Sequence, residues 1–181
     1  MSKKILILAG SPRKHGNSDH LADAFINGAE KAGHDVEKVY IKDLKISGCL
    51  GCMACQKNGG KCVQKDDMSS IYEKVMAADV LVLAFPVYFY SWNSQLKAVL
   101  DRFCAIEKLL TNTTFYILVS CAAPSMEFEQ PVLDSFRNYL SCFRAGGNTE
   151  GGFVFAFGTV NLNDAKDNEA VNQAFSMGEN V

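Results

Sequence analysis

Residues 10–18 bring small, polar and basic side chains together directly after an apolar run, in the order Gly-Ser-Pro-Arg-Lys-His-Gly-Asn-Ser. Glycines let a backbone approach a ligand closely, and the free N–H groups at a helix start suit an anion. Arg13 adds a fixed positive charge that can pair bidentately with phosphate. The sequence therefore predicts a phosphate-binding loop, with contacts from Ser11, Arg13, Lys14, Gly16, Asn17 and Ser18.

Two common phosphate-binding motifs are absent from this loop, namely Gly-x-Gly-x-x-Gly and Gly-x4-Gly-Lys-[Ser/Thr]. An ordinary strand-to-helix connection with a Ser or Asn cap is the simpler alternative. That alternative does not explain why so many ligand-type side chains share one short loop. We therefore favour the phosphate site as the interpretation of residues 10–18.

Residues 86–93 form a second unusual stretch, Pro-Val-Tyr-Phe-Tyr-Ser-Trp-Asn, in which four of the eight residues are aromatic. A flat heteroaromatic ring needs apolar and aromatic walls and a few backbone hydrogen bonds at its edge. The stretch therefore predicts a ring-binding loop. The alternatives are core packing or a contact between subunits. The expected ring contacts are Pro86, Val87, Tyr88, Phe89, Tyr90 and Ser91.

Four of the seven cysteines, Cys49, Cys52, Cys55 and Cys62, follow the spacing Cys-x2-Cys-x2-Cys-x6-Cys. In a reducing compartment, such a group favours a metal or redox site over disulfides. Steps of three residues put thiolates on one side of a tight turn, so that three of them can meet one cuboidal iron–sulfur cluster. Zinc bound by four thiolates and a loop of free thiols are the open alternatives. Cys104 lies at helical spacing and is expected in the core.

The elements that must position these residues alternate between strands and helices. Continuous or alternating apolar runs predict strands over 3–9, 35–41, 79–85, 114–120 and 151–157. Apolar residues three and four apart predict helices over 18–32, from 66 onward, and over 94–109, 128–143 and 165–177. The alternation predicts a three-layer α/β fold with a doubly wound, five-stranded parallel sheet in the order 2-1-3-4-5. In that order residues 10–17 and 86–93 meet at the edge where ligands bind.

Composition limits the class of protein. The 181 residues are 48% hydrophobic and carry a formal net charge of −2, which fits one domain over residues 1–181 with a cysteine-rich insertion at about 47–65. The charge predicts no nucleic-acid partner. No apolar stretch is long enough for a bilayer span or a secretion signal, so we expect a cytoplasmic protein without a membrane partner.

The loop motifs resemble those of a known family. Residues 10–13 with 16–18, then Pro-Val-Tyr-Phe at 86–89, then Leu-Lys-Ala-Val-Leu-Asp-Arg at 96–102, are similar to the NAD(P)H-dependent FMN reductase family of flavodoxin-like proteins. The resemblance implies FMN with its phosphate on residues 11–18 and its ring against residues 86–91. It implies a third contact from the loop at residues 121–124, with Cys121 and Ala122 as the expected contacts. It also implies a homodimer or homotetramer with the flavin near a subunit boundary, to which Tyr88, Phe89, Tyr90 and Trp92 are suited. The cysteine spacing resembles the iron–sulfur flavoprotein branch, which implies a [4Fe–4S] cluster near FMN.

The chemistry expected from this resemblance belongs to the flavin. NAD(P)H is a transient co-substrate that gives a hydride to the flavin and leaves before a flavin, quinone or similar acceptor enters, so no catalytic side chain is expected. The alternatives are an electron carrier, in which a cluster on the four cysteines exchanges electrons with FMN and a protein partner, and a non-enzymatic binding module. Asp101 and Arg102 are expected to pair with each other, and residues 161–169 to contribute no chemistry.

Overall fold

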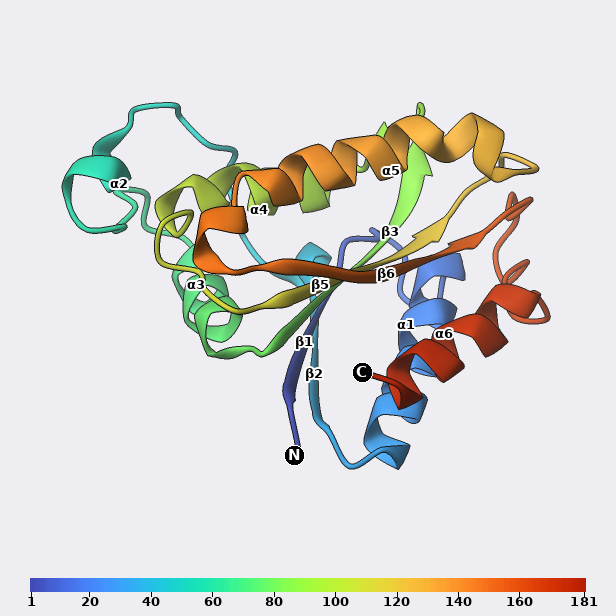
Figure 1. Ribbon diagram of the computed structural model, residues 1–181. Helices are drawn as coiled ribbons and strands as arrows, with labels where there is room; N and C mark the ends of the chain where they lie inside the picture. The colour runs from blue at the N-terminus through green and yellow to red at the C-terminus, as the bar shows by residue number, and fades with distance from the viewer.

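Five parallel strands form the sheet at the centre of the molecule, in the order β2-β1-β3-β5-β6 (Figure 1). The computed structural model describes all residues from 1 to 181. When only the parallel strands are numbered, this order is 2-1-3-4-5, as predicted. The flavodoxin-like fold class is therefore confirmed. The strands are β1 (Lys4–Ala9), β2 (Asp35–Tyr40), β3 (Val80–Tyr88), β5 (Thr114–Ser120) and β6 (Thr149–Ala156).

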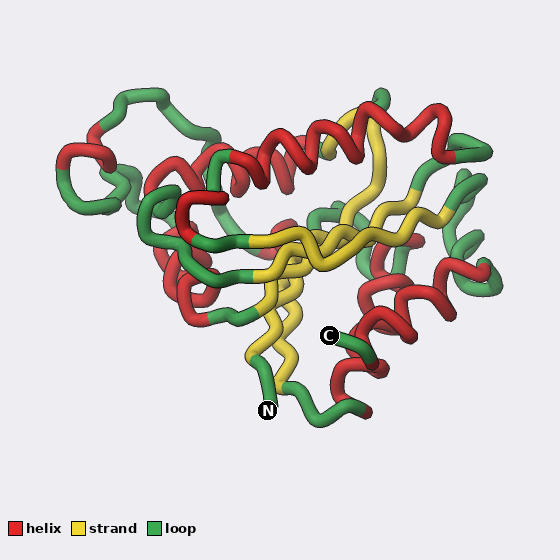
Figure 2. Tube along the Cα trace, in the orientation of Figure 1, coloured by secondary structure: helices red, strands yellow, loops and turns green.

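Helices cover both faces of the sheet (Figures 1 and 2). Two of them, α1 (Asn17–Lys31) and α6 (Glu169–Glu179), pack on one face. The other face carries α3 (Met68–Ala77), α4 (Ser94–Arg102) and α5 (Met126–Ser141). Four shorter helical turns complete the chain: η1 (Ile41–Asp43), α2 (Ala54–Lys57), η2 (Phe103–Ala105) and η3 (Arg144–Gly146).

The central strands read as unbroken apolar runs because they are buried on both faces. Along β1, Ile5 and Ile7 pack into the core beneath α1 and α6, whereas Leu6 and Leu8 pack into the core beneath α3, α4 and α5. Successive side chains of a strand point to opposite faces, so each apolar run contributes side chains to the hydrophobic cores on both faces of the sheet. Because each central strand is buried on both faces, its end is held in place, and so is the start of the loop that follows it.

Helix α6 approaches α1 very closely through two glycines. A Cβ atom on Gly28 would lie 2.1 Å from the carbonyl oxygen of Phe175, and one on Gly178 would lie 2.1 Å from that of Phe25. Only glycine allows the two backbones to approach this closely at these points. The contact holds α6 in place, and it thereby positions the polar segment of residues 157–168 at the carboxyl edge of the sheet.

The sheet has a sixth strand that the sequence analysis missed. β4 (Ser91–Trp92) pairs antiparallel with the end of β3, with Tyr88 opposite Ser91. The two residues between them, Phe89 and Tyr90, have φ values of +50° and +57°. Two left-handed residues in succession are typical of the tight type I′ turn of a β-hairpin. Residues 86–93 therefore form a hairpin rather than an irregular loop, and we call it the aromatic hairpin.

The helix predicted over residues 94–109 ends earlier, because side chains occupy the carbonyl groups that a longer helix would need. α4 stops at Arg102, whose carbonyl accepts a hydrogen bond from the Tyr72 hydroxyl at 2.9 Å. The carbonyl of Cys104 accepts from Gln56 Nε2 at 2.6 Å. The backbone consequently tightens into η2 and turns away at Ile106, whose N–H bonds to Phe103 at 2.9 Å.

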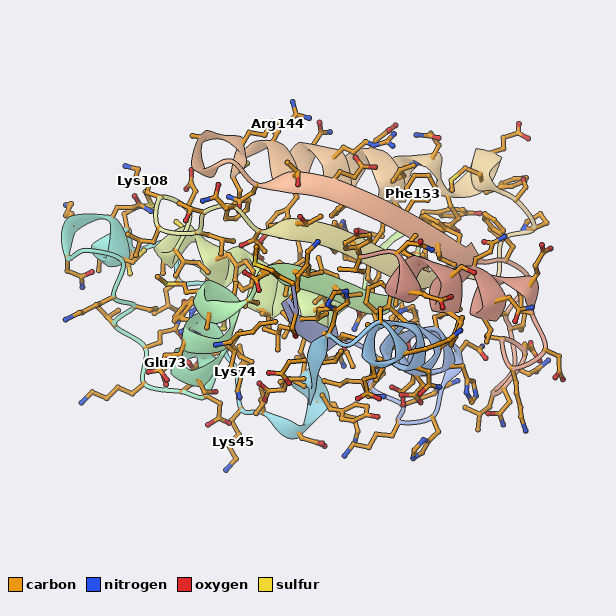
Figure 3. The ribbon with its side chains drawn as sticks, turned by 60° about the horizontal axis from the view of Figure 1, so that its bottom comes forward. Lys45, Glu73, Lys74, Lys108, Arg144 and Phe153 are labelled. Atoms are coloured by element: carbon orange, nitrogen blue, oxygen red, sulfur yellow. The ribbon has the colours of Figure 1, made fainter.

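The cysteine-rich segment lies at one end of the molecule, away from the sheet, and contains only the short helix α2 (Figure 1). Basic side chains such as Lys45, Lys108 and Arg144 extend from separate parts of the chain into solvent (Figure 3). None of the helices has both the length and the apolar character needed to span a bilayer.

Candidate functional site

A pocket of about 240 Å³ opens at the carboxyl ends of β1, β3 and β5, and we call it the switch-point pocket. Its position between β1 and β3 is where the winding direction of the sheet reverses, the usual ligand position in this class of fold. Ten of the fourteen predicted ligand contacts line it. Its full lining is Ser11, Arg13, Gly16, Asn17, Ser18, Pro86, Val87, Tyr88, Ser120, Cys121, Ala122, Thr159, Val160 and Leu162.

Hydrogen-bond donors at one end of this pocket have no acceptor within the chain. The backbone N–H groups of Gly16, Asn17 and Ser18, at the start of α1, make no backbone hydrogen bond. The Ser18 hydroxyl makes none either, and Arg13 has no carboxylate partner within salt-bridge distance, unlike the neighbouring Lys14. A helix N-terminus with free N–H groups, a hydroxyl and a guanidinium is suited to a phosphate group.

The loop that holds these donors is fixed by a buried carboxylate. His15 has a φ of +58°, and its N–H donates to Asp19 at 2.7 Å. Asp19 is only 2% exposed, and it also accepts from Lys38 at 2.8 Å and from the Tyr40 hydroxyl at 3.1 Å. Burial opposes ionisation, but these hydrogen bonds outweigh it and keep the pKa of Asp19 below its usual value. The ionised carboxylate therefore holds the strained turn in place.

Two residues of the predicted phosphate loop have other partners. Lys14 does not line the pocket, because its ammonium pairs with Asp43 at 2.6 Å and lies 4.7 Å from the centre of the Tyr40 ring. The Asn17 side chain donates to the carbonyl of Asn161 at 2.8 Å and accepts from the N–H of Ala165 at 3.1 Å. Asn17 therefore ties the start of α1 to the C-terminal segment, although we expected its side chain to donate to the phosphate.

The C-terminal segment forms part of the pocket wall, and one of its lining residues, Leu162, falls within residues 161–169, where no chemistry was expected. Thr159, Val160 and Leu162 line the switch-point pocket. The N–H of Thr159 donates to the Cys121 carbonyl at 2.9 Å, and Asp164 accepts from the N–H of Val160 at 2.8 Å. The available signal was topological: the segment follows a parallel strand, so it begins at the same edge as the other ligand loops. Ser120, the last residue of β5, was missed for the same reason.

Asn93 holds the phosphate-binding loop and the aromatic hairpin in one fixed arrangement. It is fully buried at the start of α4, and its Nδ2 donates to the carbonyl of Gly10 at 2.5 Å. The N–H of Gly10 in turn donates to Ala84 of β3 at 2.8 Å. A Cβ atom on Gly10 would lie 2.8 Å from that of Leu96, so a side chain has no room there. The two ends of the pocket are thus positioned relative to each other by packed backbone.

A second pocket, of about 400 Å³, lies beside the first, and we call it the hairpin pocket. The two pockets share Val87 and Ala122 in their walls. Phe89 is fully exposed at the hairpin tip and Tyr90 is 64% exposed. These two predicted ring contacts therefore lie in the second pocket, and Ser91 lines neither. The hairpin pocket is lined by Val87, Phe89, Tyr90, Ala122, Ala123, Pro124, Phe128 and Glu129.

Trp92 does not belong to either pocket. It is 8% exposed, its ring stacks on Phe85 at a centroid distance of 5.0 Å, and its indole N–H donates to Ser135 Oγ at 2.9 Å. The expectation that Trp92 is suited to a subunit boundary is therefore wrong. Its actual role is to pack the base of the aromatic hairpin against β3 and α5.

Glu129, on the first turns of α5, is a buried acid that the sequence analysis did not single out. It is 2% exposed, and its Oε2 atom has no hydrogen-bond partner. Burial raises the pKa of Glu129, which a hydrogen bond with the neighbouring Cys121 thiol only partly offsets. Burial and the nearby Glu129 also raise the pKa of Cys121 to about 12. The wall of the hairpin pocket therefore holds a buried acid with a raised pKa, and the Cys121 thiol beside it lies in the wall of the switch-point pocket.

The four motif cysteines line one small, mainly apolar pocket of about 30 Å³, which we call the cysteine pocket. Cys104 lines it as well and is partly exposed, so its expected burial in the core is wrong. No three His, Cys, Asp or Glu side chains lie close enough together for a single metal ion. A cuboidal cluster binds each thiolate through a different iron atom, so it holds the sulfur atoms farther apart than one zinc ion does.

A buried arginine lies in the wall of the cysteine pocket. Arg102 does not pair with Asp101, which instead contacts Lys97. Its guanidinium, 1% exposed, donates to both carboxylate oxygens of Asp66, at 2.9 and 3.1 Å, and to the carbonyl of Ser47 at 2.9 Å. Arg102 holds the pKa of Asp66 below its usual value. Its Nε–H is buried without a partner, so a residue in the wall of this five-cysteine pocket keeps one unsatisfied charged donor.

The fold and the pockets define a flavodoxin-like protein with unpartnered hydrogen-bond donors at the switch point. A family model described as NADPH-dependent FMN reductase matches residues 3–155, and the chain belongs to this family. An iron-sulfur flavoprotein of Archaeoglobus fulgidus is 41% identical over 99 residues, which are 55% of this chain and 44% of that protein. The chain thus spans about half the length of the curated relatives it matches.

Solved structures agree on the fold. The NAD(P)H:quinone oxidoreductase from Methanothermobacter marburgensis superimposes with a TM-score of 0.79 at 18% identity, covering 99% of this chain and 97% of that chain. An FMN-dependent NADH-azoreductase from Bacillus anthracis, solved in complex with FMN, gives a TM-score of 0.70 at 15% identity over 98% of this chain and 96% of that chain.

Proposed function

We propose that this protein is an FMN-dependent oxidoreductase that oxidises NAD(P)H and passes the electrons to a flavin, a quinone or a similar acceptor. The observation that carries this proposal is the group of unpartnered donors at one end of the switch-point pocket, from Arg13, Gly16, Asn17 and Ser18. Membership of the NADPH-dependent FMN reductase family supports it.

FMN fits the residues present. The donors at the start of α1 would hold its phosphate, with Ser11 shaping the turn through its hydrogen bond with the Arg13 N–H at 3.1 Å. Pro86, Val87, Tyr88, Cys121 and Ala122 would hold the ring. The ring would lie in the switch-point pocket, which leaves the adjoining hairpin pocket free. When bound, FMN supplies hydride and electron transfer, and the chain orients it and shields it from water.

The test is a spectrum of FMN-loaded protein under anaerobic conditions. Addition of NADPH or NADH should bleach the flavin absorption, and a quinone should restore it. If neither nucleotide bleaches the flavin, the proposed function is wrong. A parallel titration with riboflavin, which lacks the phosphate, should give much weaker binding than FMN if the start of α1 is the phosphate site.

A second candidate function, an iron–sulfur electron carrier, is favoured by the cysteine pocket. Cys49, Cys52, Cys55 and Cys62 would hold a [4Fe–4S] cluster, and the unpartnered Nε–H of Arg102 would donate to its sulfur. Iron and sulfide analysis of anaerobically purified protein decides between the functions. About four irons per chain support the carrier, whereas protein with full FMN and no iron leaves only the reductase.

We also propose a homodimer or homotetramer, because exposed aromatic side chains at the hairpin, Tyr88, Phe89 and Tyr90, are suited to a subunit contact near the flavin. We propose a cytoplasmic location as well, which the seven unpaired cysteines support because thiols stay reduced there. Light scattering at several protein concentrations tests the assembly, and fractionation of cells tests the location.

A further inference from the structure

The hairpin pocket has the shape and lining of a binding site for a flat ring. Two exposed aromatic side chains line it, Tyr90 at the hairpin tip and Phe128 in the first turn of α5. The pocket adjoins the switch-point pocket through Val87 and Ala122, so a ring bound here would lie next to the nucleotide site. Apolar and aromatic walls that enclose one or two polar groups are typical of small-molecule sites.

Glu129 is the acid in this pocket wall, and nothing within the chain explains its presence. Its Oε2 atom is buried without a partner, and a buried polar group without a hydrogen bond destabilises the fold. No lysine or arginine pairs with it, and the only titratable side chain that acts on it is the Cys121 thiol. The other acid of this turn, Glu127, is exposed and does not line the pocket. Burial without a counter-ion raises the pKa of Glu129 and so favours the neutral form, which can donate a hydrogen bond and a proton.

We propose that the hairpin pocket binds the electron acceptor, a planar aromatic compound with a carbonyl oxygen, and that the Glu129 carboxyl group donates a hydrogen bond and then a proton to that oxygen. This role rests on the proposed function. A quinone needs two electrons and two protons to become a hydroquinone. A hydride from the reduced flavin carries both electrons and one proton, and Glu129 gives the second proton to the carbonyl oxygen. Solvent then reprotonates the carboxylate.

The experiment compares two acceptors in three FMN-loaded variants. Menadione must bind in the hairpin pocket and receive a proton from Glu129. Ferricyanide takes single electrons and needs neither the pocket nor the proton. Glu129→Gln keeps a hydrogen-bond donor but has no acidic proton, so kcat with menadione should fall about 10²-fold while its KM changes less than threefold. Glu129→Ala should also raise KM about tenfold. Glu127→Gln is the matched control and should leave both unchanged, and ferricyanide rates should be equal in all four proteins.

A measurement without turnover separates binding from proton transfer. Oxidised holoenzyme cannot reduce menadione, so calorimetric titration gives its Kd directly. We expect similar values for the wild type and Glu129→Gln, and a Kd about tenfold weaker for Glu129→Ala. The kcat of the wild type with menadione should fall as the pH rises through the pKa of Glu129, and that of Glu129→Gln should not.

Each contrary result has a distinct meaning. If wild-type protein with NAD(P)H reduces neither acceptor, the proposed function itself is wrong, and the role of Glu129 fails with it. If ferricyanide is reduced normally but Glu129→Gln reduces menadione at the wild-type rate, only the role of Glu129 is wrong. Equal losses with both acceptors, accompanied by weaker FMN binding, would mean that Glu129 contacts the flavin, which also overturns the proposal.

Discussion

The switch-point pocket and the cysteine pocket both present hydrogen-bond donors without acceptors, but they are built in different ways. At the switch-point pocket most donors are backbone N–H groups at the start of α1, in an open pocket formed by four chain segments. At the cysteine pocket the donor is a single side-chain group, the Nε–H of Arg102, in a much smaller and mainly apolar space. The first site depends on where the backbone runs, and the second depends on particular side chains.

This difference predicts how each site responds to substitution. A pocket made by strand ends and a helix N-terminus should keep its shape when one side chain is removed, and should lose only that side chain's contribution to binding. A segment joined to the fold through one buried guanidinium should loosen when that group is lost, because Arg102 bonds to both ends of the segment, Ser47 and Asp66. Four substitutions test the contrast.

The largest effect is expected for Arg102→Leu. Removing one partner of a buried ion pair leaves Asp66 without its counter-ion, and typical costs are about 3–5 kcal/mol in unfolding free energy. Urea denaturation measures this loss, and faster alkylation of the motif cysteines would show that their segment has loosened. Arg137→Leu is the matched control, because its bridge to Glu150 is exposed and should matter little.

The pH dependence of the unfolding free energy gives a second test of the Arg102–Asp66 ion pair. Arg102 lowers the pKa of Asp66 in the folded protein, so the carboxylate stabilises the fold above the pKa of an unfolded Asp, about 3.9. That stability is lost as the pH falls through the lower, folded pKa. The wild type should therefore lose more stability than Arg102→Leu on acidification below about pH 4. Equal losses in both proteins would show that this ion pair does not stabilise the segment.

Arg13→Ala should have a large effect on ligand affinity and little effect on stability. A charge-assisted hydrogen bond to phosphate contributes about 1.5–3 kcal/mol, so the Kd for FMN should rise about 10- to 100-fold. The Kd for riboflavin should stay the same, because riboflavin has no phosphate. Lys14→Ala is the control within the same loop, since Lys14 pairs with Asp43 outside the pocket. A comparable loss in Lys14→Ala would contradict the assignment of the phosphate site to Arg13.

Gly10→Ala tests whether the two ends of the switch-point pocket are fixed by packing. The added Cβ would lie 2.8 Å from that of Leu96, and overpacking of this kind costs about 1–3 kcal/mol. Because Asn93 bonds to the Gly10 carbonyl, the shift should also weaken FMN binding. Gly48→Ala, in the cysteine-rich segment, has open space around it and should change neither stability nor FMN binding. Thermal unfolding and FMN titration measure both effects.

The same contrast explains what the sequence could predict. The position of residues 10–18 at the switch-point pocket could be predicted because strand, loop and helix start are consecutive in the chain. Thr159 and Glu129 were not predicted as pocket residues, because their positions depend on which segments meet at the sheet edge and on burial, neither of which is visible in a motif. Arg102 was assigned to its sequence neighbour Asp101, whereas its partner, Asp66, lies 36 residues away. The spacing of residues in a sequence predicts the geometry within one loop or helix. Pairs of residues that are far apart in the sequence can be identified only from the folded structure.

The smallest effect is expected for Asn17→Ala, which tests whether the C-terminal segment is part of the switch-point pocket. Its side chain makes two hydrogen bonds to this segment, at Asn161 and Ala165, each contributing about 1 kcal/mol. Hydrogen exchange at the Ala165 amide should accelerate, and the Kd for FMN should rise several-fold, because Thr159 and Val160 would be held less firmly against the pocket. His20→Ala, which removes a more peripheral contact to Asn163, is the matched control and should affect FMN binding less. If exchange accelerates while FMN affinity stays constant, the segment closes the pocket without contributing to binding, and the ligand contacts then belong to the phosphate-binding loop and the aromatic hairpin alone.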